Sequence, residues 1–282
     1  MPIDARTKLY LLMGNPVDHS LSPAMHNAAF ANLALNSIYV ACRVENDCIA
    51  PAVMGMRALN IAGANVTSPF KETVIPYLDS ISAQSEQIKS VNTIINQEGK
   101  LYGTTTDGEG FYLSLLQVAP AYKKDQSILV FGSGGAARAV AFTLAGEGSG
   151  EIVIINRSRT RGQQFSDMLM RKTPLAKSVF LPLSEQSIRK ALSRCSLVVY
   201  ALPVDSPEFL EALSKMGSFR KEQLLFDLRY KPERTAVMQA FEDKGGDAYN
   251  GLSMLFWQAV KSFEMFTGRS APEGIMKKTA GL

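Results

Sequence analysis

The sequence predicts an α/β protein of two domains, and three observations support this prediction. Its 282 residues are enough for two ordinary domains. Short apolar runs alternate with helix-like segments through about the first hundred residues, and the same alternation starts again near residue 127. A glycine-rich turn directly follows the first apolar run of this second region. We therefore expect two α/β units.

The composition excludes several broad classes of protein. The chain is 46% hydrophobic and 20% charged, which is typical of a globular protein with a full core. A net charge of +4 is too small for a nucleic-acid-binding surface. The N-terminal apolar run is too short for a signal peptide or a membrane span. We expect a cytoplasmic monomer or homodimer that binds neither nucleic acid nor membrane.

The cysteine pattern indicates reduced thiols and no metal centre. Cys42, Cys48 and Cys195 form no CxxC spacing, and the chain has only two histidines. These residues are too few and too scattered for a zinc site. We expect no bound metal.

In the first region, apolar runs predict strands and the segments between them predict helices. Ser22-Pro23 opens the first helix with a capping residue and a first-turn proline, and this helix is expected to reach Asn36. A turn at 97–99 joins two strands in a hairpin. The strands are expected at 9–13, 37–43, 61–66, 93–96 and 100–104, and the other helices at 48–59 and 109–118.

In the second region, strands and helices follow one another along the chain as in a dinucleotide-binding unit. A buried strand at 127–131 is followed by a glycine-rich turn and then by a helix at 139–148, and further strands are expected at 151–155, 197–201 and 224–228. The last segment, from residue 251, is helical. Its apolar residues at 252, 255, 256, 259, 260 and 263 form one wide face.

The glycine-rich turn reads GSGGAA and matches a GxGxxA pattern through Gly132, Gly134 and Ala137. Small residues allow a tight turn and let a pyrophosphate approach the backbone N–H groups at the helix start, where Gly135 and Ala136 lie. A plain strand-to-helix connector is the alternative. The order of strand, turn and helix favours a nucleotide site.

The segment after the next strand distinguishes the two nicotinamide cofactors. An NAD site usually has an Asp or Glu there, whereas this chain has NRSRTR, including Asn156, Arg157, Ser158 and Arg161. Arginines and hydroxyls suit a 2′-phosphate, which a carboxylate would repel. A solvated basic loop is the alternative, but its place at the strand end favours NADP(H).

A dehydrogenase also needs a group that exchanges a proton with the substrate oxygen. Lys71, within NVTSPFKE, and Asp107 each follow a predicted strand of the first region. Together they can form a proton-relay pair, although either one alone could be an ordinary surface charge. His19 and His26 are weaker candidates, because one lies in a loop and the other within the first helix.

The motifs along almost the whole chain resemble those of the shikimate dehydrogenases, in the same order and spacing. These motifs are GNPVDHSLSPAMHN at 14–27, NVTSPFKE at 65–72, VNT at 91–93, TDG at 106–108, GSGGAAR at 132–138, NRS at 156–158, DLRYKPERT at 227–235 and GLSMLFWQA at 251–259.

This resemblance implies reversible reduction of 3-dehydroshikimate to shikimate by NADPH, in aromatic amino-acid biosynthesis. It makes Lys71 and Asp107 the catalytic pair, both in contact with substrate, and adds Gly251 to the cofactor contacts. The remaining substrate contacts would be Ser20 and Ser22 to the carboxylate, Asn65, Thr67, Asn92 and Gln258 to the ring hydroxyls, and Tyr230 near the nicotinamide.

The resemblance also implies how the chain is divided. We expect residues 1–106 and 251–282 to form the substrate-binding and catalytic domain, and residues 107–250 to form a Rossmann-type NADP-binding domain. The C-terminal helical segment returns to the first domain because Gln258 must reach the substrate. Both ligands would lie in a cleft whose closure excludes water.

Three departures from the family pattern leave alternatives open. Thr105 stands where an Asn is common, Tyr200-Ala201-Leu202 replaces the usual Asn-Ala-Thr, and Lys89-Ser90 replaces smaller residues. A broad quinate/shikimate dehydrogenase is the first alternative, and a non-catalytic metabolite sensor is the second. Ser22, where quinate-preferring relatives often have Thr, favours shikimate.

Overall fold

The computed structural model describes residues 3–120, 122–173, 176–220 and 222–282. The chain divides into two compact units, one formed by 1–110 with 255–282 and the other by 111–254. Both divisions fall inside helices, namely α4 (Asp107–Val118) and α10 (Leu252–Thr267). The predicted divisions, after residues 106 and 250, fall just before these helices. The predicted two-domain α/β class is confirmed.

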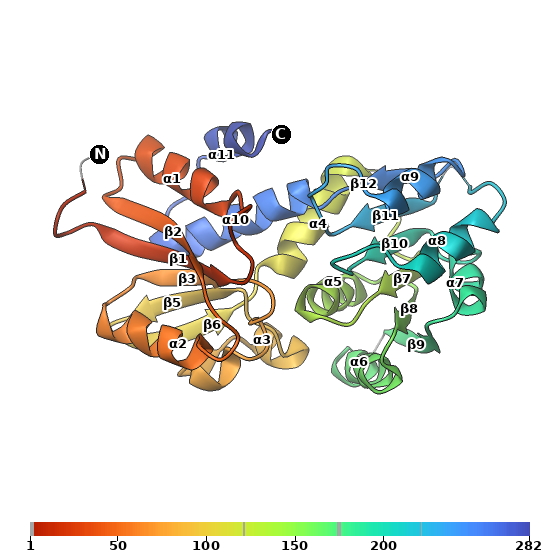
Figure 1. Ribbon diagram of the computed structural model, residues 1–282, viewed down its shortest axis with the longest axis horizontal. Coiled ribbons are helices and arrows are strands. Elements are labelled where there is room, and N and C mark those ends of the chain that lie inside the picture. Colours follow the sequence, from red (N-terminus) through yellow and green to blue (C-terminus); the bar gives the residue numbers. More distant parts are fainter. Residues whose placement is uncertain (1–2, 121, 174–175, 221) are drawn as a thin grey trace. The chain divides into compact units, whose positions relative to one another are not determined.

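The first unit is built on a mixed sheet, shown in Figure 1, with strand order β2-β1-β3-β5-β6-β4. Strands β1, β2 and β3 are parallel, whereas β5 runs antiparallel to β3 and β6. The start of β5 therefore lies at the same edge as the carboxyl ends of β1, β3 and β6. The strands are β1 (Lys8–Gly14), β2 (Ser37–Arg43), β3 (Gly63–Val66), β4 (Ser80–Ile81), β5 (Thr93–Gln97) and β6 (Lys100–Thr104).

Both faces of this sheet are covered. Tyr10 and Leu12 of β1 pack in a core with α1, α10 and α11, while Met13 packs in a second core with α2. This alternation along β1 is the period of a strand buried on both sides. The remaining helical elements of the unit are α1 (Ser22–Asn32), α2 (Ile49–Ala58), η1 (Ile75–Tyr77), α3 (Ala83–Ile88) and α11 (Glu273–Ala280).

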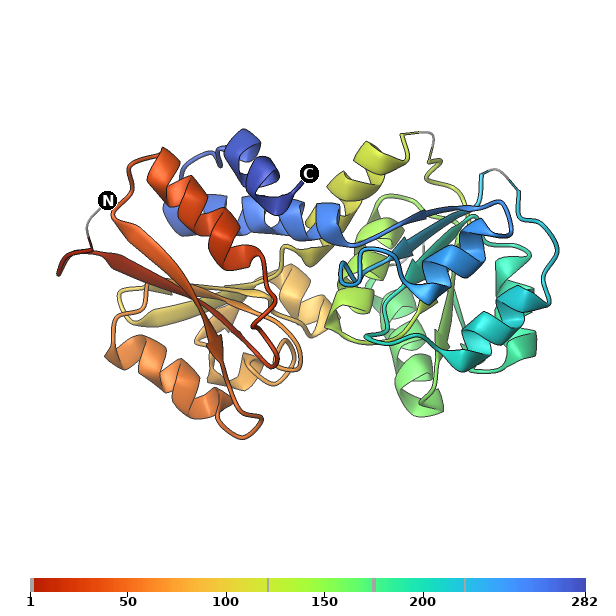
Figure 2. The ribbon, with the colours of Figure 1, turned by 45° about the horizontal axis from the view of Figure 1, so that its top comes forward.

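The second unit has a parallel sheet with strand order β12-β11-β10-β7-β8-β9; its strands are labelled in Figure 1 and have the same colours in Figure 2. The order reverses at β7, which is the doubly wound arrangement that binds dinucleotides at the carboxyl end of its first strand. Its strands are β7 (Ile128–Phe131), β8 (Glu151–Asn156), β9 (Lys177–Pro182), β10 (Leu197–Tyr200), β11 (Leu224–Asp227) and β12 (Asp247–Tyr249). Its helices, besides part of α4, are α5 (Gly135–Gly146), α6 (Arg159–Lys172), α7 (Glu185–Leu192), α8 (Pro207–Ser214) and α9 (Ala236–Glu242).

Three predicted helices have wrong boundaries, and one of them is α5, which covers Gly135–Gly146 rather than 139–148. Helix α1 ends at Asn32 rather than Asn36, because Ala34 takes a left-handed conformation with φ of 51°. Ser22 is the first residue of the helix, and Leu21 holds the capping position without a side-chain hydrogen bond. Helix α4 begins at Asp107, not near Glu109.

No helix within the described ranges is both long enough and apolar enough to cross a membrane.

Candidate active site

Lys71 and Asp107 lie together at the carboxyl edge of the first sheet. Lys71 follows β3, and Asp107 is the first residue of α4, just after β6. The Lys71 Nζ and Asp107 Oδ2 atoms are 2.6 Å apart, and their side chains are 17% and 4% exposed. The ammonium offsets the cost of burying the carboxylate, and the N-terminal end of α4 favours a negative charge at this position.

Asn92 fixes the other side of the Asp107 carboxylate. Its Nδ2 donates to Asp107 Oδ1 at 2.8 Å, while its Oδ1 accepts from the backbone N–H of Thr106 at 2.9 Å and from the Thr93 hydroxyl at 2.8 Å. The two donors on Oδ1 determine which way the amide faces. Asn92 therefore presents an N–H, not an oxygen, to Asp107.

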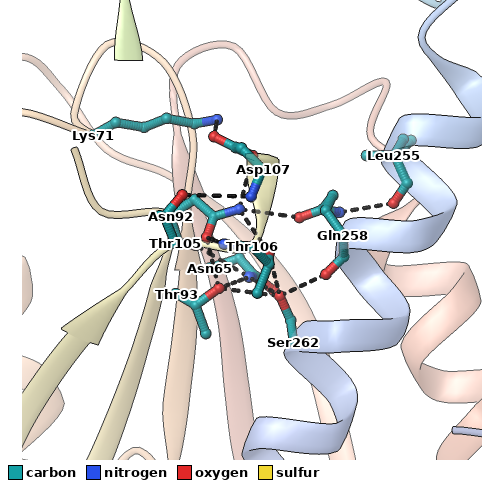
Figure 3. Close-up of polar contacts among 10 residues, drawn as sticks. All are labelled: Asn65, Lys71, Asn92, Thr93, Thr105, Thr106, Asp107, Leu255, Gln258 and Ser262. Atoms are coloured by element: carbon teal, nitrogen blue, oxygen red, sulfur yellow. Dashed lines mark hydrogen bonds and ion pairs between the residues drawn. The ribbon is translucent and has the colours of Figure 1, made fainter. Parts of the chain in front are cut away.

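A second buried amide, Asn65, lies beneath this group, as Figure 3 shows. Its Nδ2 lies near the Asn92 carbonyl at 3.1 Å, the Thr93 hydroxyl at 3.1 Å and the Ser262 hydroxyl at 2.9 Å. Its Oδ1 accepts from the Tyr39 hydroxyl at 2.8 Å. Burial raises the pKa of the Tyr39 phenol well above its usual value, so this phenol remains a donor. Both ends of the Asn65 amide thus contact protein groups.

Helix α10 brings Gln258 and Ser262 to the same cluster. Gln258 Oε1 is 3.3 Å from Asn92 Nδ2, and the Gln258 Nε2 donates to the Leu255 carbonyl at 2.9 Å. Figure 3 shows both side chains pointing from α10 toward the strand ends. Gly110 of α4 permits this approach, because an added Cβ would lie 2.7 Å from the Gln258 backbone nitrogen.

The predicted Ser20 and Ser22 lie between β1 and α1 along the chain, and Thr67 directly follows β3, all in the first unit. The Ser20 hydroxyl accepts from the Ser22 backbone N–H at 3.2 Å, and Thr67 packs beside Gly14. Among the described residues, no hydrogen bond joins these three side chains to the Lys71 cluster. The Ser22 and Thr67 hydroxyls make no hydrogen bond of their own in the described chain, so they can serve a ligand.

Several members of this cluster could not be identified from the sequence patterns alone. Tyr39, Thr106 and Ser262 were not singled out, although they connect the predicted residues. Ser262 has one signal, because it follows Gln258 by one helical turn and therefore shares its face. Tyr39 has no comparable signal in the sequence.

The structure shows the contacts of Thr105, which departs from the family pattern, and of His26, the weaker candidate for a proton donor. The Thr105 hydroxyl accepts from the Asp107 backbone N–H at 3.4 Å, at the start of α4. His26 is fully buried and stacks on Tyr39 with ring centres 4.4 Å apart. Burial lowers the pKa of His26 to about 3, so it is neutral near pH 7 and is unsuited to donate a proton there.

The glycine-rich turn of the second unit fits a dinucleotide phosphate. Gly132 is buried with φ of 122°, a conformation that favours glycine, and a Cβ there would lie 3.0 Å from the Ala201 carbonyl oxygen. Gly134 is the N-cap residue of α5, and it has no side chain that could occupy the helix N–H groups. Gly135 and Ala136, the first residues of that helix, are partly exposed. The helix start thus offers backbone donors and its positive dipole end to a phosphate.

The segment after β8 fits an additional phosphate. Arg157 and Arg161 are exposed, and the Ser158 hydroxyl caps α6 by accepting from the Arg161 backbone N–H at 3.3 Å. The Asn156 amide donates to the Ser158 carbonyl at 2.9 Å and shapes the turn. This turn offers guanidinium groups, which bind phosphate well.

Tyr230 and Gly251 belong to the second unit. Tyr230 is half-buried just after β11, and Gly251 donates its backbone N–H to the Arg229 carbonyl at 2.8 Å. A Cβ at Gly251 would overlap the carbonyl of Leu228, so this close backbone approach requires glycine. Lys71 and its hydrogen-bonded neighbours belong to the first unit, so Tyr230 and Gly251 are not part of that cluster.

Three models of known protein families together match most of the chain. A shikimate dehydrogenase substrate-binding domain matches residues 12–94, a shikimate/quinate 5-dehydrogenase domain matches 116–231, and a shikimate 5′-dehydrogenase C-terminal domain matches 251–280. The chain belongs to the shikimate dehydrogenase family.

Individual relatives are similar along almost the full length. A shikimate dehydrogenase (NADP⁺) from Desulforamulus reducens is 39% identical, over 98% of this chain and 95% of the relative. A protein of the same name from Methanopyrus kandleri is 38% identical, over 98% of this chain and 96% of the relative. The solved shikimate 5-dehydrogenase from Thermus thermophilus in complex with NADP(H) and shikimate is 31% identical, with a TM-score of 0.82, over 97% of this chain and 98% of that one. The predicted family and α/β fold are confirmed.

Proposed function

We propose that this chain is a shikimate dehydrogenase that catalyses the reversible reduction of 3-dehydroshikimate to shikimate with NADPH. The buried pair of Lys71 and Asp107, held by Asn92 beside Gln258, is the observation that carries this proposal. Full-length similarity to relatives named shikimate dehydrogenase (NADP⁺) supports the same reaction. The pathway served is aromatic amino-acid biosynthesis.

In the proposed mechanism, Lys71 and Asp107 handle the proton. NADPH, when bound, supplies the hydride that reduces the carbonyl carbon of 3-dehydroshikimate. The Lys71 ammonium donates its proton to the former carbonyl oxygen as negative charge develops there, which completes the alcohol. Asp107, 2.6 Å from the Lys71 Nζ, orients the ammonium and relays a replacement proton. Asn92 keeps the carboxylate in place for both tasks.

The remaining groups of the first unit would hold a cyclic acid with several hydroxyls. We assign Ser20 and Ser22 to the carboxylate, and their hydroxyl groups suit this acceptor. Thr67 and the amides of Asn65, Asn92 and Gln258 would contact ring hydroxyls, with Tyr230 as a further contact from the second unit. Leaving one such buried partner unpaired costs roughly 1–3 kcal/mol, which disfavours ligands that lack a hydroxyl.

The second unit would bind NADP(H). Backbone N–H groups at Gly134, Gly135 and Ala136 would hold the pyrophosphate, while Gly132, whose own N–H donates to the Ile155 carbonyl, would shape the turn beside it. The turn of Asn156, Arg157, Ser158 and Arg161 would hold the 2′-phosphate, and Gly251 would line the same ligand. We accordingly assign the substrate to the domain of 1–106 and 251–282, and the cofactor to the domain of 107–250.

Initial rates at 340 nm test this function. Purified protein is given shikimate or quinate, each with NADP⁺ or NAD⁺, in four separate reactions. Strong reduction of NADP⁺ with shikimate alone is expected, because Ser22 favours shikimate and the arginines favour a 2′-phosphate. Turnover mainly with quinate or NAD⁺ would support the broader quinate/shikimate activity. Shikimate binding without turnover in any reaction would support a metabolite sensor.

The proposed function also predicts the cellular compartment, the oligomeric state and the binding partners of the protein. We expect a cytoplasmic monomer or homodimer that binds no nucleic acid, and the net charge of +4 supports the last point. Light scattering measures the mass in solution, and a mobility-shift assay with duplex DNA detects nucleic-acid binding.

A further inference from the structure

The strand order of the second unit locates the two halves of a bound dinucleotide. Strand β7 lies between β8 on one side and β10 on the other. The arginine turn proposed to hold the adenosine 2′-phosphate follows β8. Because a dinucleotide extends across the carboxyl ends of the strands at the switch point, its nicotinamide half extends toward β10. The segment that follows β10 is therefore part of the protein surface that would face that half.

Tyr200 is the last residue of β10 and departs from the usual family sequence. It is fully buried, and its ring stacks on Phe131, the residue before the glycine-rich turn, with ring centres 5.4 Å apart. Its hydroxyl donates to the Val204 carbonyl at 2.9 Å and accepts the Ser206 backbone N–H at 2.7 Å. One side chain thus bonds to the 201–206 loop at two points.

Arg229 holds the same loop from another direction. Its guanidinium lies over the Tyr200 ring, 5.1 Å from the ring centre, and donates to the Asp205 carboxylate at 2.7 Å. At the start of the loop, the Ala201 carbonyl oxygen lies close to Gly132, at the side where another residue would carry its Cβ. The middle of the loop is apolar, and Val204 is 65% exposed. The result is a held apolar loop directly beside the glycine-rich turn.

We propose that Tyr200 is a positioning residue that holds the 201–206 loop, which we name the β10 loop, against the nicotinamide half of the cofactor. The aromatic ring anchors the strand end, and the hydroxyl sets the loop conformation. This inference rests on the proposed NADP(H)-dependent function. It explains why a family position that is usually Asn can be Tyr here: the phenol reaches further and bonds to the loop backbone itself.

Two ligands separate this role from a general structural one. NADPH contains the nicotinamide half, whereas 2′,5′-ADP contains only the adenosine half with its 2′-phosphate. Tyr200→Phe keeps the ring contacts with Phe131 and Arg229 and removes only the two loop hydrogen bonds. We expect the dissociation constant of NADPH, measured by its fluorescence, to rise about five- to thirty-fold, and that of 2′,5′-ADP, measured by calorimetry, to stay unchanged.

Two further variants complete the experiment. Tyr122→Phe is the matched control, because the Tyr122 hydroxyl is buried and has no hydrogen-bond partner in the described chain; NADPH affinity should not change. Asp205→Ala releases the β10 loop from Arg229 and should weaken NADPH in the same direction as Tyr200→Phe.

Each outcome bears on a distinct claim. Equal weakening of NADPH and 2′,5′-ADP in Tyr200→Phe would show a domain-wide effect and overturn the inference. Unchanged affinity for both ligands would overturn it as well. Failure of the unaltered protein to bind NADPH would instead contradict the proposed function.

Discussion

The orientation of the Asn92 amide determines how the Asp107 carboxylate can be used. Turning the amide over would place its oxygen against Asp107 Oδ1 and would leave the Thr106 N–H facing an N–H. An unpaired buried donor costs roughly 1–3 kcal/mol, so the observed orientation is strongly preferred. Asp107 Oδ2 then remains for Lys71, 2.6 Å away. A buried amide without charge thus defines the geometry of the charged pair.

Cofactor preference is also set by single residues. Arg157→Asp should weaken NADPH by at least tenfold while changing NADH affinity little, because the new carboxylate repels the 2′-phosphate that only NADPH carries. Fluorescence titration with each cofactor measures both affinities. Arg171→Asp is the matched control, since it makes the same charge change in the last turn of α6. Equal loss of NADPH and NADH in Arg157→Asp would contradict the assignment of the arginine turn.

The charged and amide residues of the site could be predicted from the sequence, whereas their supporting partners could not. Lys71 and Asp107 each follow a strand, and parallel or returning strands bring such positions to one edge. Tyr39 reaches Asn65 from 26 residues away, through a contact that depends on the packing of β2 beside β1. Ordinary Tyr, Thr and Ser residues carry no mark of such a contact until the sheet has formed.

The close contact between α4 and α10 depends on Gly110. In Gly110→Ala, the new Cβ would lie 2.7 Å from the Gln258 nitrogen and 2.9 Å from its Cβ, so α10 must shift. We expect the free energy of unfolding to fall by about 1–3 kcal/mol and the shikimate KM to rise, because Gln258 moves away from Asn92. Urea denaturation and initial rates measure the two effects.

Gly55 of α2 provides the control for this substitution. No atom lies within 4 Å of a Cβ added there, so Gly55→Ala should raise the free energy of unfolding by roughly 0.5–1 kcal/mol through helix propensity. An unchanged KM together with increased stability in Gly110→Ala would show that this contact does not position Gln258.

The sequence predicted the long apolar strands better than the short or polar elements. The strands β1, β7 and β8 were predicted close to their observed positions, because most of their apolar side chains are buried. The short elements β4, η1 and α3 were not expected, since two to six residues give no readable period. The end of α1 depends on the left-handed Ala34, which no glycine or proline marks.

The strand orders of the two sheets follow from non-local pairing. A doubly wound order for the second sheet could be expected from the glycine-rich turn and the repeated strands. The antiparallel β5 of the first sheet pairs Asn65 of β3 with Thr93, a register that brings Asn92 to the carboxyl edge. A local sequence pattern specifies the hairpin of β5 and β6 but not the neighbour on its other side.

The buried His26 couples the stability of the protein to pH. Neither of its ring nitrogens has a hydrogen-bond partner in the described chain, and burial lowers its pKa to about 3 from an ordinary value of 6.5. The unfolded chain therefore binds a proton below pH 6.5 that the folded chain does not bind until about pH 3. Stability should be lost as the pH falls through this window.

Urea denaturation at pH 7 and pH 5 measures this loss. From pH 7 to pH 5, His26 should account for about 2 kcal/mol of the decrease in the free energy of unfolding. His26→Phe, which keeps an aromatic ring against Tyr39, should decrease by that much less over the same range. The same pH dependence in both proteins would show that His26 is protonated in the folded state.

The most direct test of the proposed chemistry is the rate of NADPH oxidation with 3-dehydroshikimate, measured for the unaltered protein and Lys71→Ala side by side. The unaltered protein should turn over. In Lys71→Ala the turnover should fall about 10²- to 10⁴-fold, because the proton donor is gone, while calorimetry still detects shikimate binding. Lys100→Ala, on the exposed turn end of β6, should behave as the unaltered protein. Equal turnover in Lys71→Ala, or none in the unaltered protein, would contradict the account.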